Sequence, residues 1–445
     1  MRILTALTYY RPHYSGLTVY SERVARALAA RGHQVTVLTS RFDPALPAHE
    51  QMDGVQVIRP RVWLRISKGV IMPSMPFQAW KLIRQADIVH LHVPQLDAAP
   101  IALLARLLGK PVVLTYHCDL RLPHGLVHAA ANQASNLANR ITAWAANRIV
   151  HTTEDYARHS PLLCRCIDKL ATIYTPIELA PVSEPGLETF RQKHNLQPGQ
   201  RVIGMAARLA TEKGVETLAR ALPQVLEQIP QARVLYIGPY QNVVGEEEYG
   251  RRMMQLIEPL RPHWSFLGVV SDEDMAAFYR VCDVLVLPSL NSTESFGMVQ
   301  VEAIASGTPV IASDLPGMRV PVMESGAGLL VPPADAGALA QAILAILNQP
   351  ASYHGYPQKL IQRSSNEAVA AEYEQLFEEL AGAPDQRPAI HMAAQPAPTK
   401  ATALPTLPAT TSQPTASSTH TVRQAVQTTA PFAAEPPSQP GSPAS

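Results

Sequence analysis

Residues 202–228 read VIGMAARLATEKGVETLARALPQVLEQ, and this stretch decides the fold. Its first five residues are apolar and predict a buried strand. Residues 215–228 carry apolar side chains at helical spacing and predict an amphipathic helix. A buried strand that passes through a short polar loop into a helix is the repeating unit of a parallel sheet covered on both faces.

The same unit recurs on both sides of this stretch. Upstream we expect a helix at residues 18–30, capped by Gly32, and strands at residues 3–7, 34–39, 87–92, 111–115 and 148–152. Downstream we expect strands at residues 233–237, 283–287 and 309–312, and helices at residues 246–260, 272–281, 298–306, 336–348 and 366–380. Residues 174–200, rich in Pro, Gly and charge, read as a linker. We therefore predict an α/β protein with two doubly wound units and a ligand site between them.

The chain has 445 residues and a formal net charge of +1, which argues against a nucleic-acid binder that works by bulk charge. The charge is divided: residues 1–180 hold 20 Lys and Arg against 11 Asp and Glu, or +9, and residues 181–380 hold 14 against 23, or −9. No run of 18 apolar residues predicts a membrane span. Four cysteines in so long a chain make no disulfide framework, so we expect a reduced, cytoplasmic setting.

The last segment of the chain differs in composition from the rest. Residues 381–445 hold 12 of the 40 prolines, mixed with Ala, Thr, Ser and Gln. Such a segment buries too little apolar surface to offset its ordering entropy, so we expect a disordered tail. The folded part then divides into an amino-terminal domain, residues 1–176, and a carboxyl-terminal domain, residues 177–365.

Two cations stand in the loop that follows the first strand of the second unit. Arg208 and Lys213 lie five residues apart, just before the helix at 215–228. Paired cations beside free helix amides suit a diphosphate. The alternative is a solvated loop with two surface cations, and the spacing alone does not decide between them. No GxxxxGK[ST] or GxGxxG motif occurs, so neither a standard P-loop nor an NAD fingerprint is present.

A second constellation follows the strand at 283–287. Glu294 lies in the loop before a predicted helix, and Glu302 lies within that helix in an apolar run. A carboxylate can accept hydrogen bonds from sugar hydroxyls, and the amides near Phe296 can face an anion. The alternative for Glu294 is an acid that only favours the helix dipole. For Glu302 a purely solvated role is less compatible with its apolar neighbours.

Histidines follow two strands of the first unit. His117 comes directly after the strand at 111–115, where a cleft is expected, although a lone histidine is more often structural. His90, His92 and Asp97 follow the preceding strand. They are candidates for the acceptor side, with a structural role the stronger alternative, and they do not indicate a metal site.

Taken together, these motifs resemble a family of retaining glycosyltransferases that use a nucleotide sugar. This family (glycosyltransferase family 4-like, GT-B fold) includes phosphatidylinositol mannosyltransferases and sucrose-phosphate synthases. The resemblance spans about residues 1–380. It is carried by Tyr10-Arg-Pro-His-Tyr-Ser-Gly16, Arg31-Gly-His-Gln-Val-Thr-Val-Leu-Thr, Tyr116-His117, Arg208…Lys213-Gly214, Phe266-Leu-Gly268, Asp283-Val-Leu-Val-Leu-Pro-Ser289, Glu294-x7-Glu302 and Ala305-Ser-Gly-Thr-Pro-Val-Ile-Ala-Ser313.

The resemblance implies two Rossmann-like domains that face each other across a cleft, with the helix at 366–380 crossing back onto the first. It implies that Arg208 and Lys213 neutralise the donor diphosphate. Gly16 is expected in a loop that lets the backbone approach the phosphate or the acceptor. The donor is expected to be UDP- or GDP-linked, and the acceptor a lipid or a glycan.

The resemblance also assigns catalytic and sugar-binding roles. His117 and Glu294 are the expected catalytic residues. The donor sugar and nucleotide are expected to contact Glu302, Ser295, Phe296 and Gly297. Ser295 stands where the family commonly has glycine, which weakens any transfer of donor identity from relatives.

The implied reaction is front-face transfer that retains the anomeric configuration. The acceptor proton can pass to the departing phosphate oxygen, so no dedicated base is required. The cations take the place of a divalent metal, so we expect no metal and no cofactor. The rival functions are a sugar-nucleotide epimerase of the same architecture and a non-catalytic nucleotide-sugar-binding protein.

The acceptor side is less specific. Residues 59–81 and 120–144 mix basic with apolar and aromatic residues. Such segments suit an anionic membrane surface, and an ordinary domain surface is the alternative. We expect a cytoplasmic protein, with peripheral contact with the inner face of the membrane left open.

Overall fold

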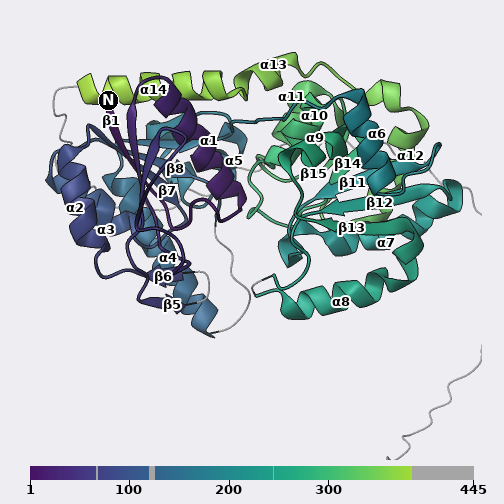
Figure 1. Ribbon diagram of the computed structural model, residues 1–445, viewed down its shortest axis with the longest axis horizontal. Helices are drawn as coiled ribbons and strands as arrows, with labels where there is room; N and C mark the ends of the chain where they lie inside the picture. Colours follow the sequence, from purple (N-terminus) through teal and green to yellow (C-terminus); the bar gives the residue numbers. More distant parts are fainter. Residues whose placement is uncertain (67–68, 120–125, 244, 383–445) are drawn as a thin grey trace, which may run out of the picture. The chain divides into compact units, whose positions relative to one another are not determined.

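A computed structural model of the chain describes residues 1–66, 69–119, 126–243 and 245–382 (Figure 1). Residues 1–386 form one compact unit. Within its described part lie an eight-stranded sheet, a six-stranded sheet and a two-stranded antiparallel ribbon. The predicted tail falls almost wholly outside the described residues.

The eight-stranded sheet belongs to the amino-terminal half. Its order is β10-β9-β8-β7-β1-β2-β4-β3, and every pair is parallel except β3 with β4. The strands are β1 (Arg2–Ala6), β2 (Gln34–Leu38), β3 (His49–Met52), β4 (Val55–Ile58), β7 (Ile88–Val93), β8 (Val112–Tyr116), β9 (Arg148–His151) and β10 (Leu170–Thr172). The separate ribbon pairs β5 (Leu64–Ile66) with β6 (Gly69–Ile71).

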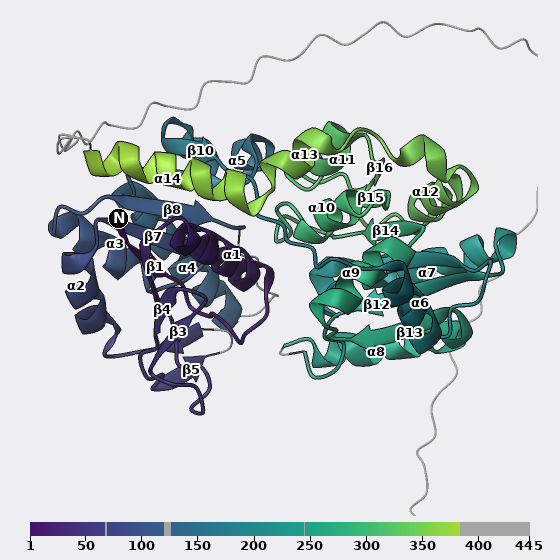
Figure 2. The ribbon, with the colours of Figure 1, turned by 45° about the horizontal axis from the view of Figure 1, so that its top comes forward.

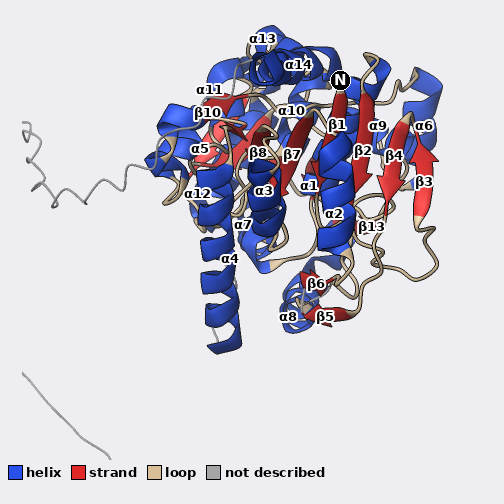
Figure 3. Ribbon diagram, turned by 90° about the vertical axis from the view of Figure 1, so that its left-hand side faces the viewer, coloured by secondary structure: helices blue, strands red, loops and turns tan. Residues whose placement is uncertain are grey.

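Helices cover both faces of this sheet. One face packs on α1 (Gly16–Ala30) and α14 (Asn366–Gly382), through Val24, Leu28 and Phe377. The other face packs on α2 (Met75–Gln85), α3 (Ala98–Leu107) and α4 (Leu126–Ala145), which lie side by side in Figure 3. The short helix α5 (Glu154–His159) follows β9.

The six-stranded sheet is wholly parallel, in the order β13-β12-β11-β14-β15-β16. Its strands are β11 (Arg201–Ala206), β12 (Ala232–Ile237), β13 (Trp264–Gly268), β14 (Val284–Leu287), β15 (Val310–Ser313) and β16 (Gly328–Val331). One face packs on α6 (Glu184–Lys193), α9 (Asp272–Val281) and α10 (Met298–Ala305). The other packs on α7 (Val215–Gln228), α8 (Glu247–Ile257) and α12 (Ala336–Asn348). Two short helices, α11 (Val320–Ser325) and α13 (Gln358–Arg363), precede α14.

The last helix crosses back onto the first half, as expected. α14 lies beside α1 in Figures 1 and 2, and its Tyr373 hydroxyl lies 2.7 Å from that of Tyr20. The carboxylate of Glu374 contacts Arg31 and lies 2.8 Å from Nε2 of His33. Tyr373 and Phe377 are fully buried, so α14 contributes to the core of the half that the chain began with.

The prediction that residues 174–200 form a linker is wrong at residues 184–193. Residues 184–193 form α6, because Ser183 caps the helix by accepting a hydrogen bond from the amide of Gly186 at 3.3 Å. Leu187 and Phe190 then face the core at helical spacing. The high Pro, Gly and charge content masked this short amphipathic pattern.

Other boundaries also shift for identifiable reasons. Helix α8 ends at Ile257 rather than residue 260, because Pro259 and Pro262 favour a 3-10 turn at Glu258–His263. The β3–β4 hairpin was missed. Its signal is the Asp53-Gly54 turn, in which both residues have positive φ angles of 47° and 80°.

Candidate functional site

The loops that follow β11 and β14 are packed directly on each other. The amide of Leu290 donates to the carbonyl of Glu212 at 2.9 Å. Gly214, with φ of 69°, lies so close to Pro288 that a Cβ at Gly214 would stand 1.8 Å from its carbonyl oxygen. The two sequence constellations therefore form one site in the carboxyl-terminal half.

This packing brings two predicted residues together. Nζ of Lys213 forms an ion pair with Oε2 of Glu294, and their side chains are 21% and 15% exposed. Arg208 forms an ion pair with Glu212, four residues along the same loop. Both predicted diphosphate-binding cations thus have a carboxylate partner, and both remain within reach of solvent.

The start of α10 presents backbone amides at the same place. Gly297 precedes the helix with φ of 77°, and a Cβ there would stand 2.5 Å from a methyl group of Leu287. No side chain caps this helix end. Phe296 is buried against Tyr174, with ring centroids 5.7 Å apart, while Ser295 is only partly buried. The free helix amides carry a partial positive charge that suits an anion.

Glu302, the other predicted carboxylate, has partners other than Lys213. Its Oε1 accepts a hydrogen bond from Nη1 of Arg23 at 2.8 Å, and its Oε2 accepts one from the hydroxyl of Tyr279 at 2.8 Å. Burial and the charge of Glu302 raise the pKa of Tyr279 well above its usual value. Both oxygens of the carboxylate are therefore engaged within the protein.

His117 follows β8, as predicted, and lies within a cluster of buried aromatic side chains. Its Nε2 is 3.0 Å from Nδ1 of His92, and the ring of Tyr20 meets it edge to face at 4.9 Å. Burial lowers the pKa of His117 to about 3. At neutral pH the ring is therefore uncharged, which suits hydrogen bonding rather than proton delivery.

Tyr156 of α5 bridges the end of β8 and the loop after β14. The hydroxyl of Tyr156 donates to the carbonyl of Ser292 at 2.8 Å and contacts Asp119 at 3.1 Å. Burial, together with the charge of Glu294, raises the pKa of the Cys118 thiol to about 12. The residues next to His117 are thus electrostatically coupled to the Lys213–Glu294 pair.

The prediction that Gly16 lies in a loop is wrong. It is the first residue of α1 rather than part of a loop, because Ser15 caps the helix by accepting from the amide of Thr18 at 3.2 Å. A Cβ at Gly16 would stand 3.7 Å from the Met298 methyl group, an ordinary contact. The backbone there needs no glycine, although it does lie near the start of α10.

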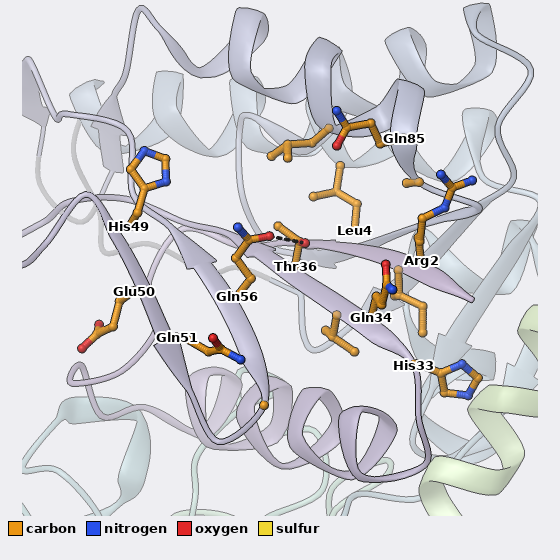
Figure 4. Close-up of a pocket in the computed structure, with 15 residues that line it drawn as sticks. Arg2, Leu4, His33, Gln34, Thr36, His49, Glu50, Gln51, Gln56 and Gln85 are labelled. Atoms are coloured by element: carbon orange, nitrogen blue, oxygen red, sulfur yellow. Dashed lines mark hydrogen bonds between the residues drawn. The ribbon is translucent and has the colours of Figure 1, made fainter.

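A separate hollow of about 610 Å³ lies on the outer part of the eight-stranded sheet. Figure 4 shows polar side chains that line it, among them Gln34 of β2, Gln56 of β4 and His49 of β3, with Gln85 from α2. None of the predicted site residues lines it. In the described part of the chain, no group of three His, Cys, Asp or Glu side chains has the arrangement of a metal site.

Two family models match the chain and together span most of its folded part. Residues 14–180 match Glycosyltransferase Family 4, and residues 187–366 match Glycosyl transferases group 1. The chain belongs to this glycosyltransferase family. The gap between the two matches, residues 181–186, includes the start of α6 at Glu184.

Similar proteins and structures agree with this membership. A phosphatidyl-myo-inositol mannosyltransferase of Mycolicibacterium smegmatis is 27% identical over 86% of the chain and 95% of its own length. A D-inositol 3-phosphate glycosyltransferase of Pseudarthrobacter chlorophenolicus is 26% identical over 76% and 83%. The structure of sucrose-phosphate synthase from Thermosynechococcus elongatus has a TM-score of 0.67, at 24% identity, over 86% and 99%. Anabaena HepE in complex with UDP-glucose has a TM-score of 0.69, at 19% identity, over 85% and 100%. The fold of this glycosyltransferase is GT-B.

Several site residues of this glycosyltransferase were missed from the sequence. They contact the motif residues but do not belong to the motifs, and they are Arg23, Tyr279, Tyr156 and Cys118. The contact of His92 with His117 was also missed. Arg23 and Tyr156 lie 279 and 136 residues from their partners, whereas Tyr279 and His92 lie 23 and 25 residues from theirs, on neighbouring elements. For Cys118 the only signal was its place after His117, and Arg23 gave none beyond its position in a predicted helix.

Proposed function

We propose that this glycosyltransferase moves a hexose from a UDP- or GDP-linked sugar to a lipid or glycan acceptor, with retention of the anomeric configuration. The observation that carries the proposal is the Lys213–Glu294 pair at the joined loops after β11 and β14. A cation and a carboxylate at one place suit the two parts of a nucleotide sugar, because the diphosphate is anionic and the sugar offers hydroxyl donors. The names of similar proteins support this choice, since they include a mannosyltransferase and a protein bound to UDP-glucose.

In the proposed reaction, the bond from the anomeric carbon to the diphosphate oxygen breaks, and the acceptor oxygen forms its bond on the same face. The acceptor proton passes to the departing phosphate oxygen. Negative charge grows on that diphosphate as the bond loosens. Arg208 and Lys213 exchange their carboxylate partners for phosphate oxygens, and they stabilise the transition state more than the ground state. We propose that these cations suffice and that no divalent metal is needed.

The test is a screen of purified protein against UDP- and GDP-sugars, with and without candidate lipid and glycan acceptors. Transfer should give a product with the donor's anomeric configuration by NMR, and EDTA should leave the rate unchanged. An inverted product would defeat the retaining mechanism. Complete loss in EDTA, with recovery on adding magnesium or manganese, would defeat metal independence. Conversion of UDP-GlcNAc without any acceptor would favour an epimerase instead.

For the acceptor we propose a lipid presented at an anionic membrane surface, with the protein on the cytoplasmic side. Large aromatic side chains are exposed on the amino-terminal half, including Trp63 at 78% and Phe77 at 58%. Arginine side chains stack on two further aromatic rings of this half. The Arg84 guanidinium is 4.9 Å from the Trp80 ring, and the Arg106 guanidinium is 4.5 Å from the Trp144 ring. Aromatic and basic side chains together favour the headgroup region of a bilayer. No helix among the described residues is long and apolar enough to span a membrane.

Flotation with liposomes tests this acceptor side. The wild-type protein should float with vesicles that contain anionic lipid at low salt, and a Trp63→Ala/Phe77→Ala/Trp80→Ala variant should not. Tyr356→Ala is the matched control, because Tyr356 is 86% exposed but lies in the carboxyl-terminal half. Absence of wild-type flotation at low salt would leave a soluble glycan as the acceptor.

A further inference from the structure

Two histidines of neighbouring strands face each other beside the candidate site. His92 lies on β7 and His117 follows β8, and Nδ1 of His92 is 3.0 Å from Nε2 of His117. Burial lowers the pKa of both rings, that of His117 to about 3. Both imidazoles are therefore neutral at physiological pH, and each carries one N–H group. One ring must donate and the other must accept across this contact.

The second nitrogen of His92 decides which ring donates. Its Nε2 is buried and has no hydrogen-bond partner. If His117 donated, the proton of His92 would sit on Nε2 as a buried N–H group with nothing to accept it. If His92 donates from Nδ1, its Nε2 is an unpartnered acceptor. Buried donors without partners are rarer in proteins than under-satisfied acceptors, so the second arrangement is favoured.

We propose that His92 is a positioning residue that fixes the tautomer of His117, so that His117 carries its proton on Nδ1. With Nε2 engaged by His92, Nδ1 is the ring nitrogen left to contact a ligand, and it presents an N–H donor. Such a donor suits an oxygen of the transferred sugar or the departing phosphate. This inference rests on the proposed function for the identity of the ligand, but the tautomer itself does not.

The surroundings of the pair hold both rings in place. The Tyr20 ring meets His117 edge to face, and its hydroxyl contacts Tyr373 of α14 at 2.7 Å. Tyr373 in turn contacts Thr115 at 2.8 Å, and Thr115 contacts His90 at 2.7 Å. The ring of His90 lies 4.3 Å from that of His92. The hydroxyls of Tyr20, Tyr373 and Thr115 are thus already paired, and rotation of the His92 ring away from His117 would break the hydrogen bond that joins the two rings.

The first test is a long-range proton–nitrogen correlation spectrum of the full chain labelled with nitrogen-15 histidine. A His117→Gln variant assigns the His117 signals. At neutral pH, we expect His117 to be neutral and protonated on Nδ1. Protonation on Nε2, or an imidazolium ring, would overturn the proposal whether or not the protein transfers sugar.

The second test separates positioning from packing. His92→Leu removes the donor, whereas His92→Asn keeps an amide N–H at the position of Nδ1. Loss of the outer partner that orients a metal-bound histidine lowers activity by about ten- to a hundredfold, and we take this range for His92. We expect His92→Leu to lower kcat by that factor with little change in KM for the donor, and His92→Asn to restore most of it. His194→Phe, which removes another histidine with an unpartnered buried Nε2, is the control.

The outcomes are distinct. A folded His92→Leu variant with unchanged kcat, or a His92→Asn variant as slow as His92→Leu, would overturn the positioning role. If the wild-type protein transfers or hydrolyses no nucleotide sugar, the proposed function fails, and the tautomer is still judged from the spectrum. Thermal melting of each variant shows whether the fold is retained.

Discussion

The guanidinium of Arg23 in α1 lies 2.8 Å from the carboxylate of Glu302 in α10 and joins the two halves of the protein. The same guanidinium donates to the carbonyls of Pro176 at 3.0 Å and Glu178 at 3.3 Å, in the segment that links the halves. Glu302 is among the residues expected to contact the donor sugar and nucleotide, and a carboxylate suits the two hydroxyls of a ribose. A ribose bound there must therefore take the place of Arg23 or share the carboxylate with it.

Replacing Arg23 should accordingly strengthen nucleotide binding. Arg23→Met removes a competitor for Glu302, and the net loss of one hydrogen bond costs about 1 kcal/mol, so affinity for UDP or GDP should rise about fivefold. Titration calorimetry measures the change. A 2′,3′-dideoxy nucleotide should gain nothing. Arg26→Met is the control, because Arg26 lies on the same helix and pairs with Glu178 instead. Weaker UDP binding by Arg23→Met would mean that Arg23 supports Glu302.

Loss of Lys213 should slow transfer far more than it weakens folding. Removing one preorganised group that stabilises developing charge lowers kcat by about a hundred- to a thousandfold. We expect Lys213→Met to fall in this range, measured as initial rates of sugar transfer. Lys193→Met removes a comparable ion pair, with Asp274, on the surface of the same half and should keep the wild-type rate. Equal rates for the two variants would remove Lys213 from the site.

The joint between the two loops should be sensitive to one methyl group. Gly214→Ala places a Cβ against the carbonyl of Pro288 and should lower the free energy of unfolding by about 2 kcal/mol more than Gly199→Ala. Both glycines have positive φ, but no atom lies within 4 Å of a Cβ at Gly199. Denaturant unfolding gives the comparison. Similar values for both variants would show that the loops separate without loss of stability.

The buried histidines should make stability depend on acid. Burial lowers the pKa of His90 and His117 to about 3 and that of His151 to about 4, against about 6.5 when unfolded. Between these values the unfolded chain binds more protons, so stability is complete above about pH 6.5 and falls as the pH drops toward 3–4. Each such histidine adds about 1.4 kcal/mol per pH unit within this window.

His90→Leu tests this dependence with one histidine removed. The free energy of unfolding, measured from pH 6.5 to pH 4.5, should fall less steeply in the variant. The difference in slope should be about 1.4 kcal/mol per pH unit, the contribution of one proton. The absolute stability at pH 7 is not the measured quantity, because the variant also loses the hydrogen bond to Thr115. Parallel slopes for wild type and variant would contradict the buried, neutral state of His90.

The sequence predicted most of what depends on local pattern. The strand–helix alternation predicted helices at 215–228, 272–281 and 336–348 with the bounds that the structure has. The chemical motifs lie at strand ends, and the structure joins Lys213 to Glu294 there. Both results follow because hydrophobic periodicity and strand-end loops are properties of short segments.

Long-range pairing could not be predicted in the same way. Arg23 and Glu302 are 279 residues apart, and nothing in the sequence pattern of α1 distinguishes Arg23 from Arg26 on the same helix. The same holds for His92. It lies within the buried strand β7, and its position there does not distinguish it from any other buried strand residue. Such contacts depend on how two finished units pack, which is a property of the tertiary fold.

Helix α14 places a constraint on the order in which the chain can fold during synthesis. Its Tyr373 and Phe377 fill the core of the half that begins at Met1, yet they leave the ribosome after the whole second half. The last strand of the first half, Leu170–Thr172, is therefore made about 200 residues before α14 can cover the apolar face of its sheet. The second half has all its strands and helices soon after it is synthesised. A nascent chain arrested before residue 366 should accordingly bind chaperones through its first half.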